Sequence, residues 1–196
     1  MDVKNFPELN GLVLVGGKSS RMGKDKGFLD YHGLPQREYT FRLIQNFCKM
    51  TWFSCREDQV ASLKSNNVVI DQFPNAGPLG AILSAFRQNL NCAWLVVACD
   101  LPLLKKETIQ KLIDHRNPAK IATAYKSPVD HKPEPLIAIW EPSALPLLEK
   151  SMSKEKSGPR KLLMMNEAFL INPDDPEELK NANNPEDFRE IKSRLK

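Results

Sequence analysis

Hydrophobic positions along the chain alternate between short β-branched runs and longer stretches with the 3.6-residue spacing of an amphipathic helix. The short runs fit buried strands at residues 11–15, 51–54, 67–70, 93–98, 121–124, 136–139 and 169–172. Helical patterns lie between or after them at residues 36–49, 78–89, 105–116, 142–150 and 185–196. Strands that alternate with helices are typical of a parallel sheet whose connections cross over its faces. The pattern predicts an α/β fold, a three-layer sandwich with a mostly parallel, Rossmann-like sheet and crossover helices.

Two stretches lack this periodicity. Residues 125–134 and 151–159 are rich in charge and proline, and they predict long loops. Loops of this kind often border binding sites, and the alternative is a mobile surface loop.

The composition fits a soluble globular protein with one domain, residues 1–196. Hydrophobic residues make up 41% and charged residues 27%. The net charge of +4 is too small to indicate a nucleic-acid partner by itself, and it suits a small anionic substrate equally well.

Targeting and metal-knuckle patterns are missing from the sequence. The first ten residues hold no apolar core of signal-peptide length, and no stretch approaches the roughly 20 apolar residues of a membrane span, so we expect a cytoplasmic protein with no membrane partner. The four cysteines are isolated in apolar surroundings and predict buried free thiols. The three histidines show no metal-ligand spacing and predict surface or loop positions.

A glycine-rich basic loop follows the first predicted strand. Gly16 and Gly17 let the backbone turn sharply and approach a ligand without interference from a Cβ atom. The residues that follow carry four cations and one acid: Lys18, Arg21, Lys24, Lys26 and Asp25. Amides and positive charge together predict a polyphosphate site, and the alternative is a solvated basic surface loop.

Neither common phosphate loop matches this segment. A Walker loop needs four residues between its first glycine and the Gly-Lys-Ser/Thr end, whereas Gly17 and Gly23 enclose five residues. Asp25 also stands where the magnesium-binding hydroxyl would lie. The dinucleotide fingerprint G-x-G-x-x-G is absent.

An acidic residue closes the most apolar predicted strand. The run from Trp94 to Cys99 ends in Asp100, and Pro102 then forces the chain out of the sheet. Ligands of open α/β sheets bind at the carboxyl ends of the strands, so Asp100 and the glycine-rich loop should face one crevice. A carboxylate there can hold Mg²⁺ together with phosphate oxygens and water. A turn or helix-cap role is the alternative for Asp100.

A third segment runs from Asp71 through Gly77-Pro78-Leu79-Gly80 into a predicted helix. The glycines permit close approach of a flat base, and the Asp71 carboxylate can accept from both the N1–H and the amino group of guanine. The alternative is a tight turn that Asp71 caps.

These residues resemble a known family. The segment from Val15 to Lys26 is similar to the signature loop of the molybdenum cofactor guanylyltransferases, Leu-Ala-Gly-Gly, a spacer, Arg-Met-Gly, a spacer and Asp-Lys, with Val15 in place of the alanine. The glycine, Arg-Met-Gly and lysine elements occur more widely in nucleotidyltransferases, and the pair Asp25-Lys26 narrows the match to this family.

Further elements agree in order and spacing. The segment Cys99–Pro102 resembles the family's Cys-Asp-x-Pro element, and Asp71 with Gly77-Pro78-Leu79 resembles its Asp, spacer, Gly-Pro-Leu element. Residues 133–136 look like its Pro-x-x-Leu stretch, and residues 181–187 resemble its closing Asn-x-Asn-Thr-Pro-Glu-Asp with Asn184 in place of threonine. The resemblance implies a nucleotide-diphospho-sugar transferase-like fold.

The resemblance implies a transfer of GMP from GTP to the terminal phosphate of molybdopterin, with Mg²⁺ as the cofactor and pyrophosphate as the second product. It implies Arg21, Lys26 and Asp100 as catalytic residues, with Asp100 as the metal ligand. Nucleotide-binding positions would be Leu14, Val15, Gly16, Gly17, Lys26, Asp71, Gly77, Pro78, Leu79, Gly80 and Asp100. Candidates on the acceptor side are Asn181, Asn183 and Arg160, with the neighbouring Lys161. The expected partners are these two small molecules, with no nucleic acid, and contact with cofactor-synthesis proteins or molybdoenzymes.

Two alternatives remain at this stage. One is an enzyme of the same fold that uses CTP on the pterin or activates a sugar phosphate. The other is a catalytically silent GTP-binding assembly factor, although such a protein has less need of a metal carboxylate at Asp100.

Overall fold

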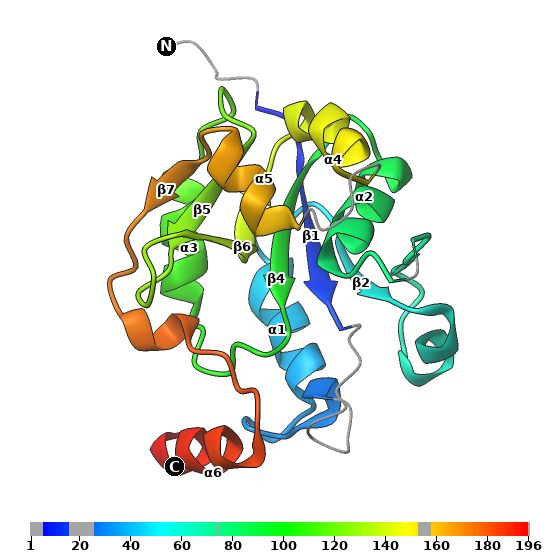
Figure 1. Cartoon of the computed structure of the whole chain (residues 1–196). Coiled ribbons are helices and arrows are strands. Elements are labelled where there is room, and N and C mark those ends of the chain that lie inside the picture. The colour runs from blue at the N-terminus through cyan, green and yellow to red at the C-terminus, as the bar shows by residue number, and fades with distance from the viewer. Residues whose placement is uncertain (1–5, 16–25, 74, 153–157, 196) are drawn as a thin grey trace.

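Seven strands form a single sheet in the part of the chain that the computed structural model describes, which is residues 6–15, 26–73, 75–152 and 158–195 without the side chain of Lys26. Their order across the sheet is β3-β2-β1-β4-β6-β5-β7 (Figure 1). The strands are β1 (Leu9–Leu14), β2 (Thr51–Cys55), β3 (Val68–Ile70), β4 (Ala93–Ala98), β5 (Ala122–Lys126), β6 (Pro133–Trp140) and β7 (Phe169–Ile171).

The sheet is mostly parallel, as predicted. Only β6 runs antiparallel to its neighbours β4 and β5 among the described strands. The carboxyl ends of the other strands therefore meet at one edge, together with the amino end of β6. The chain order changes direction between β1 and β4, which is the switch point where ligands of such sheets bind.

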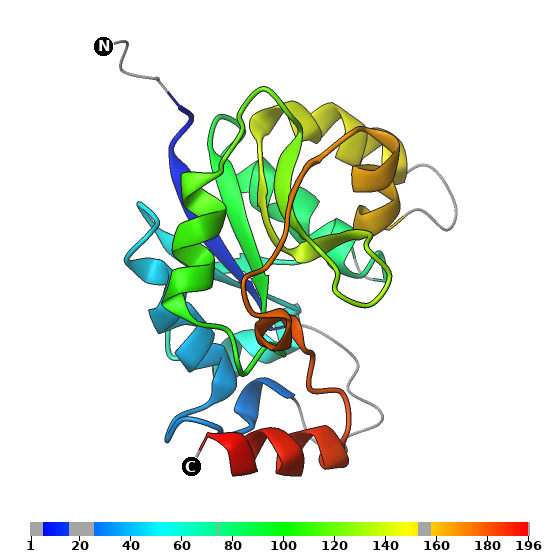
Figure 2. The same cartoon turned by 90° about the vertical axis from the view of Figure 1, so that its left-hand side faces the viewer.

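Helices cover both faces of the sheet. They are α1 (Gln36–Gln45), α2 (Pro78–Gln88), α3 (Lys106–Asp114), α4 (Leu145–Met152), α5 (Pro159–Met165) and α6 (Pro185–Arg194). Alternate residues of β1 supply the two cores, since Val13 packs with α1 and α3 and Leu12 packs with α2, α4 and α5. Figure 2 shows these helix layers on opposite sides of the sheet, which confirms the three-layer sandwich.

Helix α6 lies outside the sandwich, beyond the edge where the parallel strands end (Figures 1 and 2). Its residues Phe188 and Ile191 pack with Tyr31 and Ala182 in a small separate cluster. Asn184 begins the helix with a capping box, in which its side chain accepts from the Asp187 amide at 2.9 Å. No helix within the described ranges is both long and apolar enough to cross a membrane.

Helix α3 receives its cap from a distant part of the chain. Lys105 occupies the N-cap position without a side-chain cap of its own. The buried carboxylate of Glu178 instead accepts from the Lys105 amide at 3.2 Å, from the Lys105 ammonium at 2.9 Å and from the hydroxyl of Thr108. Residues 175–179 therefore fix the start of α3.

Several predicted boundaries were wrong. Helix α1 stops at Gln45 because the chain turns there to enter β2, and the Lys49 amide bonds to the Leu9 carbonyl at 2.8 Å. Residues 142–144 form a 3₁₀ turn ahead of α4, since Pro146 lacks the amide that an α-helical bond to residue 142 needs.

The described parts of the two irregular stretches contain regular structure, while residues 153–157 lie outside the described residues. Residues 125–134 form the tip of the β5–β6 hairpin, with strand pairing up to Lys126 and from Pro133 onward. The prolines of β6 are tolerated there because β4 pairs with that strand only from Ile137. Part of the second stretch opens the short helix α5, in which Pro159 takes the first helical position.

Candidate active site

Three predicted motifs meet along one hydrogen-bonded edge of the sheet. The Asp71 amide donates to the Cys55 carbonyl at 2.9 Å, and the Val15 amide donates to the Ser54 carbonyl at 3.0 Å. The Cys99 amide donates to the Leu14 carbonyl at 3.2 Å. The ends of β3, β2, β1 and β4 are thus linked in sequence. Asp71, the start of the glycine-rich loop and Asp100 consequently face the same edge.

The glycine-rich loop itself begins at the end of β1. Leu14 and Val15 are buried in the two cores, so a ligand can reach these residues only through their backbone. Gly16, Gly17 and Arg21 lie outside the described residues. Lys26 begins a 3₁₀ turn, Lys26–Phe28, and its side chain is likewise outside the description. The expected approach of Lys26 to Asp100 stays a prediction.

Asp100 is partly buried on a loop that donors from distant segments hold in place. Four donors bind backbone carbonyl oxygens of this loop. The Ala182 amide donates to the Asp100 carbonyl at 2.9 Å, and the Gln36 side-chain amide donates to the Leu101 carbonyl at 3.4 Å. His32 Nε2 donates to the Pro102 carbonyl at 2.8 Å, and the Tyr39 hydroxyl donates to the Leu104 carbonyl at 3.4 Å. Because a carbonyl oxygen only accepts, His32 carries a proton on Nε2. The loop is therefore clamped between the start of α1 and the segment that precedes α6.

Tyr31 lies between this loop and α6. Its ring is 4.9 Å from the ring of Phe188, and the residue is 7% exposed. Its hydroxyl is buried and has no hydrogen-bond partner in the described part of the chain. Burial raises the pKa of Tyr31 to about 12, and the negative charges of Asp187 and Asp100 add to the shift. The phenol is therefore neutral at physiological pH and able to donate.

Asp71 turns the chain from β3 toward α2. Its Oδ1 accepts a hydrogen bond from the Phe73 amide at 2.9 Å. One oxygen of this carboxylate therefore caps the turn, as the alternative interpretation predicted. Burial raises the pKa of Asp71, while hydrogen bonds from the Phe73 amide and Ser84 oppose the shift. A Cβ atom on Gly80 would lie 3.0 Å from Asp71 Oδ1 and 2.9 Å from Phe73 Cβ. Only glycine lets α2 pack this closely on the Asp71 turn.

Gly77 and Pro78 form the exposed entrance to α2. Gly77 has φ +58° and ψ −146°, a backbone conformation that glycine alone adopts readily, and Pro78 occupies the first helical position. Leu79 is buried in the core, so it offers a base only its backbone. The four predicted residues of this segment thus lie together beside Asp71.

The acceptor-side candidates also reach this edge. Asn181 and Asn183 are exposed on either side of Ala182, whose amide bonds to the Asp100 carbonyl. Arg160, at the start of α5, forms ion pairs with Glu134 at 2.7 Å and Asp130 at 3.3 Å. Glu134 lies at the amino end of β6, so these pairs bring Arg160 to the edge where the parallel strands end. The adjacent Lys161 is exposed on α5.

The described residues fit a cation that arrives with its substrate. They contain no group of three or more His, Cys, Asp or Glu side chains arranged to hold a metal ion. Asp100 supplies an oxygen donor at the switch point, and Mg²⁺ in proteins commonly takes one or two carboxylates and completes its coordination with phosphate oxygens and water. The cysteines are free thiols, three of them buried and Cys48 partly so, which confirms that prediction.

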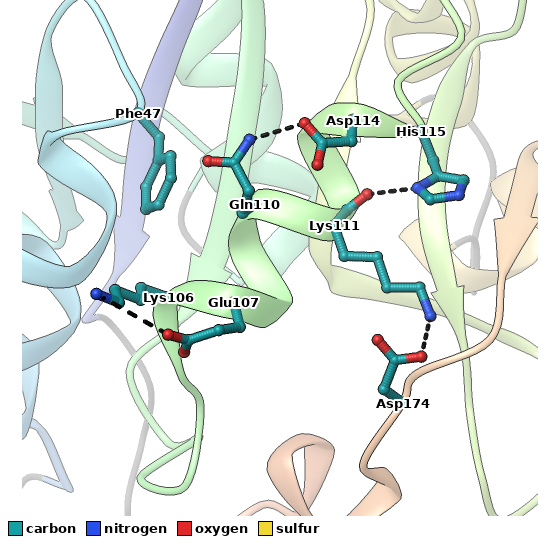
Figure 3. Close-up of a pocket in the computed structure, with 8 residues that line it drawn as sticks. All are labelled: Phe47, Lys106, Glu107, Gln110, Lys111, Asp114, His115 and Asp174. Atoms are coloured by element: carbon teal, nitrogen blue, oxygen red, sulfur yellow. Dashed lines mark hydrogen bonds and ion pairs between the residues drawn. The ribbon is translucent and has the colours of Figure 1, made fainter.

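A separate pocket of about 590 Å³ lies on the outer face of α3 (Figure 3). Figure 3 shows Lys111 pointing to Asp174 and Gln110 pointing to Asp114. Its lining shares no residue with the predicted site: Phe47, Lys106, Glu107, Gln110, Lys111, Asp114, His115 and Asp174.

The sequence patterns did not indicate Tyr31, His32 or Gln36 as parts of this region. Each acquires its place through contact with a segment more than 60 residues away in the chain. A buried tyrosine or glutamine after a loop carries no local signal of such a contact.

Comparisons with known proteins agree with this arrangement. Residues 11–169 match the MobA-like NTP transferase domain. The chain is 35% identical over 97% of its length to a molybdenum cofactor biosynthesis bifunctional protein of Synechocystis, of which it spans 55%. It is 30% identical to the molybdenum cofactor guanylyltransferase of Pseudomonas putida strain KT2440, with 92% of this chain and 96% of that protein covered.

A solved structure shares the fold. The crystal structure of molybdopterin-guanine dinucleotide biosynthesis protein A from Archaeoglobus fulgidus superposes with a TM-score of 0.78 at 22% identity, covering 94% of this chain and 97% of that one. With the family match extending over most of the chain, from β1 to the start of β7, the chain belongs to the MobA-like NTP transferase family.

Proposed function

We propose that this chain is a molybdenum cofactor guanylyltransferase, which transfers GMP from GTP to the terminal phosphate of molybdopterin. The continuous edge from Asp71 through Val15 to Cys99 carries the proposal, since it brings the base, phosphate and metal motifs side by side. The relative from Pseudomonas putida carries this activity in its name. We take residues 1–196 to act as one nucleotidyltransferase domain.

The chemistry is a substitution at the α-phosphorus of GTP. An oxygen of the acceptor phosphate forms a bond to this phosphorus, and the bond to the bridging oxygen of pyrophosphate breaks. An ionised phosphate needs no general base, so the protein acts by position and charge. Lys26 and Arg21 would offset the charge of the triphosphate, and the amides of Gly16 and Gly17 would cradle it. A Mg²⁺ ion held by Asp100 would offset negative charge on the phosphate oxygens.

Guanine would rest beside Asp71. The ends of β3 and β1 are separated by one strand, which corresponds to about 10 Å at the usual strand spacing, so a ribose can bridge the base and phosphate sites. The exposed backbone at Gly77 and Pro78 offers the flat surface, with Leu79 and Gly80 behind it. Burial of Asp71 strengthens hydrogen bonds from the N1–H and amino group of guanine, because a low dielectric strengthens polar interactions.

Molybdopterin would approach from the side of β6 and the segment before α6. Asn181 and Asn183 flank the amide that holds Asp100, and Arg160 with Lys161 supplies positive charge at the start of α5. We further propose the cytoplasm as the place of reaction and proteins of cofactor assembly or molybdoenzymes as recipients of the product.

An assay with four nucleotides tests the proposal. The purified chain is incubated with Mg²⁺, molybdopterin and ATP, CTP, GTP or UTP in turn, and pyrophosphate and the dinucleotide product are measured. We expect pyrophosphate release with GTP and with none of the other three nucleotides. Release with CTP would assign a different nucleotide, release only when a sugar phosphate replaces molybdopterin would assign a different acceptor, and GTP binding without release would indicate a silent binding protein.

A further inference from the structure

The hydroxyl of Tyr31 is a buried polar group that the fold leaves unused. Only 7% of the residue's surface is exposed, and its hydroxyl has no hydrogen-bond partner among the described residues. A buried hydroxyl without a partner lowers stability, because it gives up its hydrogen bonds to water and gains none in the protein. The apolar neighbours of its ring, Leu29, Leu103 and Phe188, would pack against phenylalanine equally well. The hydroxyl therefore calls for an explanation other than packing.

The loop that carries Asp100 packs beside the ring of Tyr31. Ala182 packs in the same cluster as Tyr31, and its amide donates to the Asp100 carbonyl at 2.9 Å. Leu103, three residues after Asp100, packs against the same cluster. The negative charge of Asp100 also acts on the phenol. The ring is thus fixed to both segments that hold the Asp100 loop.

Asp187 is the other carboxylate close to Tyr31, and it already has a structural task. Its Oδ2 accepts from the Asn183 amide at 2.7 Å and from the Asn184 amide at 3.2 Å, which completes the capping box of α6. These bonds hold Asp187 in the capping box at the start of the helix.

We propose that Tyr31 is a positioning residue for Asp100. Its hydroxyl donates to one carboxylate oxygen of Asp100 when the other oxygen turns to a divalent cation. The inference rests on the metal-binding role of Asp100 in the proposed function. Carboxylates that bind metals are themselves hydrogen-bonded by neighbouring groups, and loss of such a partner typically weakens metal affinity 10- to 100-fold.

The variant Tyr31→Phe tests this role because it keeps the ring and removes only the hydroxyl. Mn²⁺ serves as the paramagnetic probe, and its binding to the protein with GTP and without acceptor is followed by electron paramagnetic resonance. We expect about 10- to 100-fold weaker Mn²⁺ binding and a matching rise in the Mg²⁺ concentration that gives half-maximal pyrophosphate release. At saturating Mg²⁺ the KM for GTP should remain within about twofold of wild type, since the proposed contact of the hydroxyl is with Asp100 and not with the nucleotide.

Tyr125→Phe is the matched control. Tyr125 is fully buried as well, but its hydroxyl donates to the Thr108 carbonyl at 2.7 Å within α3. Loss of the Tyr125 hydroxyl should leave Mn²⁺ binding unchanged. Equal Mn²⁺ affinity of Tyr31→Phe and wild type would overturn the proposal.

A measurement on the unmutated chain covers the case in which Tyr31→Phe fails to fold. The chain contains three tyrosines, so 3-fluorotyrosine labelling gives three ¹⁹F resonances that single substitutions assign. Addition of Mg²⁺ and GTP should shift the Tyr31 resonance and leave that of Tyr125 in place. An unmoved Tyr31 resonance at saturating nucleotide would also overturn the proposal.

The two proposals can fail separately. If wild type releases no pyrophosphate with molybdopterin while Tyr31→Phe still weakens Mn²⁺ binding, the proposed function fails and the role of Tyr31 stands. If wild type is active and Tyr31→Phe binds Mn²⁺ normally, the role of Tyr31 fails and the proposed function stands.

Discussion

The backbone amide of Ala182 donates to the carbonyl of Asp100 at 2.9 Å, across 82 positions of the chain. This bond joins the loop after β4 to the segment that precedes α6. It also brings the exposed Asn181 and Asn183 to the side of the proposed metal carboxylate. The edge of the sheet and the carboxyl-terminal segment therefore form one surface around Asp100.

Replacing Asp100 with asparagine should abolish most of the transfer. Asp100→Asn keeps the shape of the side chain and removes its charge, so we expect a loss in kcat on the order of 10²- to 10³-fold, by analogy with the removal of a single charge-stabilising group. Pyrophosphate release measures the effect, and circular dichroism checks the fold. The control Asp174→Asn removes an exposed acid that pairs with Lys111 on α3, and it should leave the rate unchanged. A rate for Asp100→Asn within threefold of wild type would contradict the assignment.

Adding a methyl group at Gly80 should disturb the Asp71 turn. Its Cβ would lie 2.9 Å from Phe73 Cβ, 3.0 Å from Ala76 Cβ and 3.0 Å from Asp71 Oδ1, so these atoms must move. We expect Gly80→Ala to lower the free energy of unfolding by about 1–3 kcal/mol and to raise the KM for GTP. Urea unfolding and steady-state kinetics measure the two effects. At Gly158, where φ is −119° and no atom of the described residues lies within 4 Å of an added Cβ, the same change should be tolerated.

The ion pair between Arg116 and Glu141 should be essential for stability. The guanidinium donates to both oxygens of Glu141, at 2.7 and 2.9 Å, and to the Pro7 carbonyl at 2.9 Å, while the two side chains are 7% and 1% exposed. Arg116→Ala leaves a buried carboxylate unpaired, so we expect a loss of about 3–5 kcal/mol in the free energy of unfolding. Lys49→Ala breaks an exposed pair with Glu8 and should cost only about 0–1 kcal/mol. If urea unfolding gave the same loss of unfolding free energy for Arg116→Ala and Lys49→Ala, burial would not decide how much each ion pair stabilises the fold.

The thiols of Cys48, Cys55 and Cys92 should be unreactive near neutral pH. Burial raises the pKa of Cys55 and of Cys92 to about 11 and that of Cys48 to about 12, each from 9.0. At pH 8 a pKa of about 11 leaves about 100-fold fewer thiolates than a pKa of 9, so native thiols should react with a disulfide reagent far more slowly than unfolded ones.

The same shifts set an alkaline limit to stability. Between pH 9 and about 12 the unfolded chain releases thiol protons that the native chain retains, so the free energy of unfolding falls as the pH rises. The stabilising contribution is fully present below pH 9. Urea midpoints at pH 8, 9.5 and 11 should therefore decrease in that order, and fast native thiol labelling at pH 8 would argue against the burial of these side chains.

Much of the fold could be predicted because its strands are strongly apolar and short. The strand Ala93–Ala98 and the proline that opens α6 follow directly from local patterns. The meeting of Asp100 with the start of the glycine-rich loop was also predictable, since carboxyl ends of parallel strands share an edge. These inferences need only the hydrophobic period and the rule for parallel sheets.

Contacts between distant segments could not be predicted in this way. Nothing around Tyr31 indicates that it packs with Phe188, and nothing around Glu178 indicates that it caps α3. Helix α5 was missed because seven residues after Gly-Pro give too short a period to separate from a loop. In these places tertiary packing decides the structure, and a single sequence does not display it.

The hydrogen bonds from Lys105 to Glu178 and from Ala182 to Asp100 also bear on how the chain folds during translation. A nascent chain that has emerged as far as Ile171 already contains the residues of every strand of the described sheet, yet it lacks the carboxylate of Glu178 and the amide of Ala182, which bind the segment between β4 and α3. The segment up to Ala182 must therefore be synthesised before the loop that carries Asp100 acquires these hydrogen bonds.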